Sequence, residues 1–218
     1  MPFSGGFLQG VGGRWLDDSG APLFQRNNYQ SALRWLDIMQ TASSSGALVE
    51  FNGTRDLTLF KQGKIGLFVE DSSLRFAIAQ ALGEENLMID AWPKLDSGRL
   101  TGFVESDVVY LNTNAGQRQP LEKEAGLQFM GLLMTAAVQQ RLAEQGIVPA
   151  VRDAQPRNRL TAQAAAAFET GVPYPAIWQS ELRARYGTAL NAAAQAVYEK
   201  RSTPLAALQS AFQQITNP

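Results

Sequence analysis

Residues 59–69 have the sequence LFKQGKIGLFV, which combines the end of a helix, a turn and a short apolar run. A helical pattern stops at Gly63, and the apolar run Ile65–Val69 follows after Lys64. A short apolar run bounded by polar residues is typical of a strand buried on both faces, as in a parallel sheet. We therefore predict a strand at 65–69, and a helix followed directly by a buried strand favours an α/β fold.

The sequence on both sides continues this alternation of helices and strands. Upstream, apolar side chains recur with helical spacing and predict a helix that begins at Asn27. Downstream, Ser72–Ser73 offers N-caps for a helix that ends at Gly83. Two further buried strands are predicted at 86–92 and 107–112. A doubly wound sheet usually has more strands than these three, so either the Gly-rich start and residues 47–50 supply others or part of the fold is absent.

The last hundred residues are predicted to be mostly helical. A helical period runs from Leu121 to Ala136 and continues as far as Gly146. The final helix is expected to begin with Thr203 as its N-cap and Pro204 as its first residue. The fold is therefore α/β but rich in helices.

The composition excludes several classes of function. The chain has 218 residues, with 19 basic and 20 acidic side chains, no cysteine and no histidine. These absences exclude disulfides, thiol nucleophiles, Ser-His-Asp triads and histidine-based zinc sites. We therefore expect a protein that is not an enzyme and holds no cofactor or metal. The balanced charge argues against nucleic-acid binding.

Four segments occur in the same order as in a known family. They are the aromatic start 3–13, the unit 59–69, the stretch from 93 to 150 that ends in QGIVPA, and the segment STPLAAL at 202–208. Together they resemble the C-terminal part of extracellular solute-binding proteins of family 1, the maltose-binding type of ABC-importer receptor. The resemblance implies a periplasmic-binding-protein-like second lobe that is helix-rich, with an incomplete first lobe.

The resemblance also implies that the chain is divided into three parts. Residues 1–100 resemble an α/β segment of the second lobe, and residues 101–156 resemble the crossover strand and helices that return to the first lobe in the family. Residues 157–218 resemble C-terminal helices that pack on the second lobe. A truncated domain of this kind would be a shortened protein, a fragmentary gene product or a chain that completes itself by oligomerising.

By resemblance, the protein is a solute-binding part of an ABC-importer receptor, with carbohydrate as the expected solute and an ABC permease as partner. The implied location is periplasmic or extracellular. The first eight residues lack the basic and apolar regions of a signal peptide, so none is expected in this chain. Two alternatives stay open: a carboxylate-dependent enzyme such as a glycoside hydrolase, and a self-associating fragment that binds no solute.

Solute contacts in the family come from loops at the carboxyl ends of strands. By resemblance, the substrate-binding residues here are Glu70, Asp71, Ser72, Ser73, Glu105, Ser106, Asp107, Tyr174, Trp178, Phe3 and Phe7. Carboxylates accept hydrogen bonds from sugar hydroxyls, and aromatic rings stack on the apolar faces of sugars. Four carboxylates would also suit a cationic solute such as a polyamine. In the alternative structural roles, Ser72 or Ser73 is an N-cap and Trp178 is a core residue.

Overall fold

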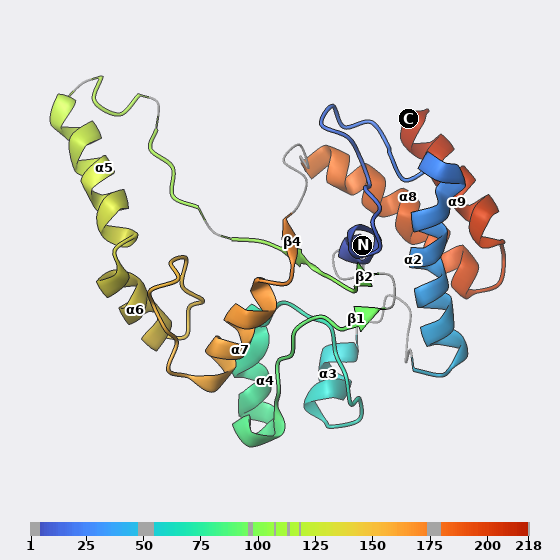
Figure 1. Ribbon diagram of the computed structural model, residues 1–218, viewed down its shortest axis with the longest axis horizontal. Coiled ribbons are helices and arrows are strands. Elements are labelled where there is room, and N and C mark those ends of the chain that lie inside the picture. Colours follow the sequence, from blue (N-terminus) through green and yellow to red (C-terminus); the bar gives the residue numbers. More distant parts are fainter. Residues whose placement is uncertain are drawn as a thin grey trace. The chain divides into compact units, whose positions relative to one another are not determined.

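The computed structural model describes residues 5–47, 55–95, 98–106, 108–112, 114–117, 119–173 and 180–217. The chain divides into two compact units, whose elements are labelled in Figure 1. Unit 1 consists of residues 1–87, 92–104 and 171–218, and unit 2 consists of residues 88–91 and 105–170. None of the described helices is both long enough and apolar enough to cross a membrane.

Three long helices form the centre of unit 1. They are α2 (Arg26–Ser44), α8 (Ser180–Tyr198) and α9 (Pro204–Thr216), and the short helix α1 (Gly5–Gly10) lies against α2 (Figure 1). Helices α8 and α9 are packed against each other, and each also contacts α2. Both bury small side chains, which allow helices to approach closely: Ala189, Ala193, Ala207 and Ala211.

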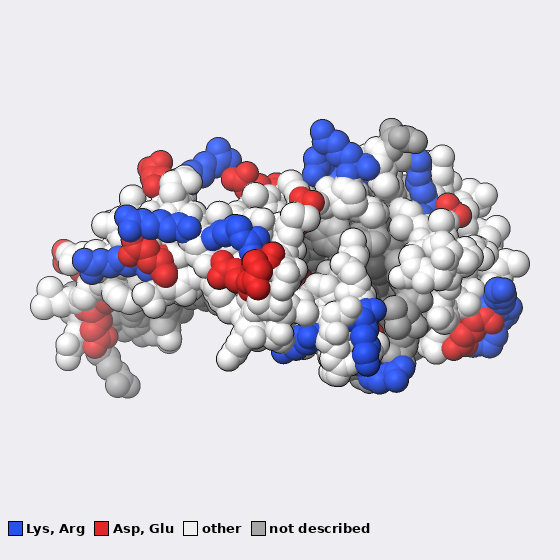
Figure 2. Space-filling model, turned by 90° about the horizontal axis from the view of Figure 1, so that it is seen from below, with Lys and Arg blue, Asp and Glu red and all other residues white. Residues whose placement is uncertain are grey.

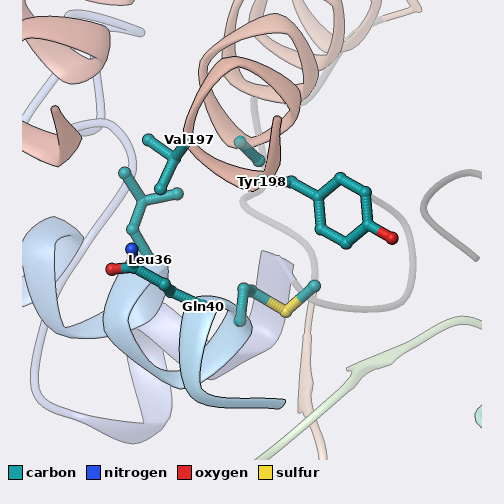
Figure 3. Close-up of a pocket in the computed structure, with 6 residues that line it drawn as sticks. Leu36, Gln40, Val197 and Tyr198 are labelled. Atoms are coloured by element: carbon teal, nitrogen blue, oxygen red, sulfur yellow. The ribbon is translucent and has the colours of Figure 1, made fainter. Parts of the chain in front are cut away.

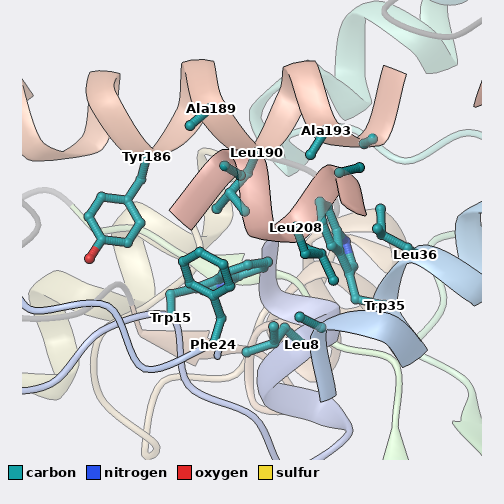
Figure 4. Packing of buried hydrophobic residues seen from close by; sticks show 14 of the residues in the cluster. Leu8, Trp15, Phe24, Trp35, Leu36, Tyr186, Ala189, Leu190, Ala193 and Leu208 are labelled. Atoms are coloured by element: carbon teal, nitrogen blue, oxygen red, sulfur yellow. The ribbon is translucent and has the colours of Figure 1, made fainter. Parts of the chain in front are cut away.

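Two tryptophans fill the core between these helices (Figure 4). Trp15 and Trp35 are both buried, and their rings meet edge to face with centroids 5.1 Å apart. The indole N–H of Trp15 donates a hydrogen bond to the carbonyl of Gly5 at 2.5 Å. Both tryptophans are therefore packing residues of the core.

Tyr186 ties α8 to the turn that precedes α2. Its ring is buried, and its hydroxyl donates a hydrogen bond to the carbonyl of Gly20 at 3.1 Å. The turn is held by Asp17, whose Oδ1 accepts from the backbone N–H groups of Ser19 and Ala21. Burial raises the pKa of Tyr186 to about 12.

We expect the stability of unit 1 to fall as the pH rises from about 10 to about 12. In this range the unfolded tyrosine loses its proton while the buried Tyr186 keeps it, so rising pH favours unfolding. Urea unfolding midpoints measured across this range should fall in the parent chain and change less in Tyr186→Phe. The exposed Tyr110 provides the control, since Tyr110→Phe should retain the full fall. Equal pH dependence in both variants would contradict this role of Tyr186.

Two helix starts show how far local sequence determines the ends of helices. The predicted helix near Asn27 exists as α2, but Asn27–Tyr29 has positive φ angles, so regular helix begins after Tyr29. Asparagine tolerates this left-handed conformation better than most residues. The start of α9 is confirmed as predicted. Thr203 Oγ1 accepts from the N–H of Ala206 at 3.3 Å, and Pro204 is the first helical residue.

The described strands of unit 1 are only two residues long. β1 (Lys94–Leu95) and β2 (Gly98–Arg99) form an antiparallel pair, and β3 (Phe103–Val104) is parallel to β4 (Val172–Pro173). Strands this short cannot show the period-two pattern by which a strand is recognised in sequence. None of the four was predicted as such.

The three predicted buried strands at 65–69, 86–92 and 107–112 are wrong for the residues that the structure describes. No strand is assigned in these segments, and their apolar side chains are not all buried. Leu67 is 78% exposed and Tyr110 is 84% exposed. An apolar run becomes a buried strand only when neighbouring strands from distant sequence pair with it, and no described strand does so here.

A further helical segment of unit 1 follows α2 in the chain. It contains α3 (Asp56–Lys61), the 3-10 helix η1 (Ser72–Leu74), α4 (Arg75–Leu82) and the 3-10 helix η2 (Glu84–Asn86). The predicted end of α4 at Gly83 is confirmed, since Gly83 has a φ of 87°. A positive φ of this kind favours glycine and stops a helix.

Unit 2 contains α5 (Pro120–Leu133), α6 (Ala136–Glu144) and α7 (Arg159–Phe168). The buried Gln139 holds the chain that follows α6. Its Oε1 accepts from the N–H of Ala150 at 2.7 Å, and its Nε2 donates to the carbonyl that ends α5 at 2.7 Å. This amide therefore fixes α5, α6 and the loop after α6 to one another.

Candidate functional site

The predicted site residues Glu70–Ser73 lie together in one polar loop before α4. Asp71 Oδ1 accepts from the N–H of Ser73 at 2.7 Å, and the N–H of Asp71 donates to Glu70 Oε1 at 2.9 Å. The N-cap of η1 is thus Asp71, and the prediction of Ser72 or Ser73 as the cap is wrong by one or two positions. Asp, Ser and Asn cap helices equally well, so the residue types alone could not decide between these positions.

Arg75 is a charged residue of this loop region that sequence reasoning missed. It is only 6% exposed, and its Nη1 donates to the carbonyl of Ser72 at 2.7 Å. Its Nε is buried and has no hydrogen-bond partner in the described part of the chain. Desolvation lowers the pKa of Arg75, and the charge of Asp71 opposes that shift. The guanidinium lies 4.5 Å from the ring centroid of Phe76, so an aromatic face also supports it.

A stacked aromatic pair holds the chain that leads into the loop. Phe60 in α3 and Phe68 have ring centroids 5.2 Å apart and an interplanar angle of 27°. This contact anchors the unpaired segment 65–69 on α3 in place of strand pairing. The polar loop 70–73 therefore begins from a fixed point and ends at the start of α4.

The remaining predicted residues are distributed over different parts of the chain. Glu105 and Ser106 belong to unit 2, where both are exposed, whereas Glu70–Ser73 belongs to unit 1. Four predicted residues lie outside the described residues: Phe3, Asp107, Tyr174 and Trp178. Each unit thus contains one polar part of the predicted site.

Phe7 lies in α1 and is used in packing. It is 8% exposed and meets Trp92 edge to face, with ring centroids 5.4 Å apart. Both residues belong to unit 1, and Phe7 is part of its main core. A ring packed in this way leaves little surface for stacking on a sugar.

A shallow pocket lies between α2 and α8 in unit 1 (Figure 3). Its volume is about 220 Å³, including space that is open to solvent. The pocket is lined by Leu36, Met39, Gln40, Ala194, Val197 and Tyr198. Small-molecule sites usually measure about 300–1,000 Å³ and contain several converging polar groups. This depression has two polar side chains, so it is a weaker candidate than the loop before α4.

Charged side chains of both signs are interspersed on the face of the molecule shown in Figure 2. The described residues contain no group of three or more Asp and Glu residues that could hold a metal ion. The described part of the loop before α4 therefore offers hydrogen bonds from individual polar side chains.

One comparison with known proteins identifies the fold. No protein-family model and no curated protein sequence matches the chain. A solved structure does match, namely the maltose/maltodextrin-binding domain MalE from Bdellovibrio bacteriovorus bound to maltotriose, with a TM-score of 0.67 and 19% identity. The match covers 98% of this chain and 56% of that chain. The chain has a solute-binding-protein-like fold.

This match confirms the predicted fold class. The chain is a helix-rich part of a periplasmic-binding-protein-like fold, and it spans little more than half the length of the matching structure. Because nearly the whole chain is covered, both units belong to the matched fold. The predicted division at residues 100 and 156 stays a prediction. The structure groups residues 88–91 and 105–170 into one unit and the rest of the chain into the other.

Proposed function

We propose that the protein binds a solute, with carbohydrate as the expected class, as part of the receptor of an ABC importer. The observation that carries this proposal is the match over 98% of the chain to a MalE domain bound to maltotriose. The four ordered segments that resemble family 1 solute-binding proteins support the same assignment. A permease partner and a periplasmic or extracellular location belong to the same proposal.

The loop before α4 offers the chemistry that a sugar requires. Glu70 and Asp71 present carboxylate oxygens, which accept hydrogen bonds from adjacent hydroxyl groups. Arg75 holds the loop by its hydrogen bond to the carbonyl of Ser72. We therefore assign solute contact to Glu70 and Asp71 and a positioning role to Arg75. Solute contact by Glu105 and Ser106, which are exposed in unit 2, stays a separate prediction.

Replacement of Asp71 with asparagine is expected to weaken oligosaccharide binding about tenfold, because a hydrogen bond to a charged acceptor is stronger than one to a neutral acceptor. Asparagine also caps helices, so the loop should keep its structure. Binding of maltotriose is measured by calorimetry and by saturation-transfer NMR, which also detects weak binding. Asp18→Asn, at an exposed position elsewhere in unit 1, is the control.

Two outcomes would contradict the proposal. If the chain binds spermidine but no sugar, the carbohydrate class is wrong. If it binds neither sugars nor polyamines by either method, the solute-binding function is wrong. Equal weakening by Asp71→Asn and Asp18→Asn would remove the loop before α4 from the site.

A further inference from the structure

Arg75 carries a buried positive charge that no acidic side chain neutralises by direct contact. The side chain is only 6% exposed. None of the ion pairs among the described residues includes Arg75. Its guanidinium contacts the carbonyl of Ser72 and the ring of Phe76, which are both uncharged. Buried charges in folded proteins are normally paired, so this guanidinium lacks the counter-ion that is usual for a buried arginine.

The two acidic residues of the loop use their carboxylates to hold the backbone. Glu70 Oε1 accepts from the N–H of Asp71 at 2.9 Å, and Asp71 Oδ1 accepts from the N–H of Ser73 at 2.7 Å. Asp71 is also exposed, so water weakens the attraction between its charge and that of Arg75. The counter-ion of Arg75 is therefore expected to come from outside the loop.

One edge of the guanidinium has unused donors. Nη1 donates to the carbonyl of Ser72 at 2.7 Å. Nε and Nη2 form another edge of the same planar group, and neither donates a hydrogen bond to a described residue. Two parallel donors on one edge match the two oxygens of a carboxylate. Because Nε is enclosed, a ligand reaches this edge from Nη2, and the neighbouring groups must shift for Nε to take part.

The charges around Arg75 favour a carboxylate over a phosphate group. Glu70 and Asp71 repel any anion that approaches the loop, and the repulsion is about twice as large for a phosphate group as for a carboxylate. The same two residues suit hydroxyl groups, since carboxylate oxygens accept hydrogen bonds from them. A solute that carries both hydroxyl groups and a carboxylate therefore fits all three side chains. Uronic acids are sugars with this combination of groups.

We propose that the solute is an acidic sugar of the uronic-acid class, and that the Nε–Nη2 edge of Arg75 binds its carboxylate. This inference rests on the proposed function, because it uses the same loop, and it adds the class of sugar. Arg75 then has two roles. Nη1 holds the loop through Ser72, and the other edge holds the solute. The bound carboxylate supplies the missing counter-ion, while hydroxyl groups of the sugar contact Glu70 and Asp71.

Trigalacturonic acid and its methyl ester test the proposal on the unmodified chain. The two trisaccharides have the same hydroxyl groups, and only the acid carries free carboxylates. Binding of each is measured by calorimetry and by saturation-transfer NMR, beside maltotriose. We expect the acid to bind at least about tenfold more tightly than its ester, because a charge-assisted hydrogen bond is stronger than a neutral one.

Arg75→Gln separates the charge of Arg75 from its role in the loop. Glutamine can still donate to the carbonyl of Ser72, but it has no charge, so the ratio of the two affinities should fall to near one. A disturbed loop alone would weaken both ligands and leave this ratio unchanged. Arg34→Gln, at an exposed position in the same unit, removes the same charge and should keep the ratio. The comparison of acid and ester on the unmodified chain decides the proposal even if Arg75→Gln does not fold.

The results that would overturn the inference differ from those that would overturn the proposed function. Equal affinities for the acid and its ester, with maltotriose bound, would remove the acidic-sugar class and leave solute binding intact. An unchanged ratio in folded Arg75→Gln would place the carboxylate away from Arg75. Tighter binding of glucose 6-phosphate than of trigalacturonic acid would make the anion class wrong. If no saccharide binds, the proposed function fails together with the inference.

Discussion

Replacement of Trp15 with alanine is expected to lower the free energy of unfolding of unit 1 by about 4 kcal/mol. Trp15 is fully buried and contacts Trp35 edge to face, so the change removes a large apolar side chain and leaves a cavity. It also leaves the carbonyl of Gly5 without the indole donor. A loss of this size is a large fraction of the stability of a typical domain, which is about 5–15 kcal/mol.

A pair of phenylalanine variants separates the hydrogen bond from the packing. The indole N–H of Trp15 donates to Gly5, whereas that of Trp35 is buried and has no partner among the described residues. Trp15→Phe should therefore cost about 1–2 kcal/mol more than Trp35→Phe, because it alone breaks a hydrogen bond. Urea unfolding followed by circular dichroism measures both. Equal costs would show that the Gly5 hydrogen bond contributes nothing to stability.

The helices could be predicted from the sequence because their signals are local. The start of α9 depends on Thr203 and Pro204, and the end of α4 depends on Gly83, all within one turn of the residues that they affect. The start of α2 was predicted within a few residues, and only the left-handed stretch Asn27–Tyr29 was missed. Helical spacing also predicted the long pattern that the structure divides into α5 and α6.

The strands could not be predicted because their partners are distant in the sequence. The run Ile65–Val69 has the composition of a buried strand, but its anchor is the ring of Phe60. The strand β3 pairs with β4, which lies almost seventy positions further along the chain. Neither a two-residue strand nor its distant partner leaves a periodic pattern, so sequence reasoning placed strands in apolar runs instead.

The local structure around Glu70–Ser73 was predicted in part, whereas solute contact by these residues stays a prediction. The position of Glu70–Ser73 after an apolar run correctly indicated a polar loop before a helix. Arg75 was missed, because a charged residue inside a helical segment gives no signal of burial. Its spacing of four from Asp71 was the available clue, since residues four apart on a helical turn are neighbours.

Replacement of Gly10 with alanine is expected to destabilise unit 1 by about 3 kcal/mol, although alanine is the better helix former. A Cβ atom on Gly10 would collide with the backbone carbonyl oxygen of Arg99 in β2, and one on Gly6 would collide with that of Thr101. These two glycines let α1 lie directly on the chain from β2 to β3. Since the blocking atom belongs to the backbone and not to a flexible side chain, α1 must move away from β2 to accept the methyl group of alanine.

The same substitution at Gly187 provides a control with the opposite sign. Gly187 lies inside α8 in the same unit, and nothing lies within 4 Å of a Cβ atom placed there. Gly187→Ala should therefore stabilise unit 1 by up to about 1 kcal/mol, because it reduces the entropy of the unfolded chain. Urea unfolding of both variants measures the difference. If Gly10→Ala is as stable as Gly187→Ala, the close contact between α1 and β2 does not exist in solution.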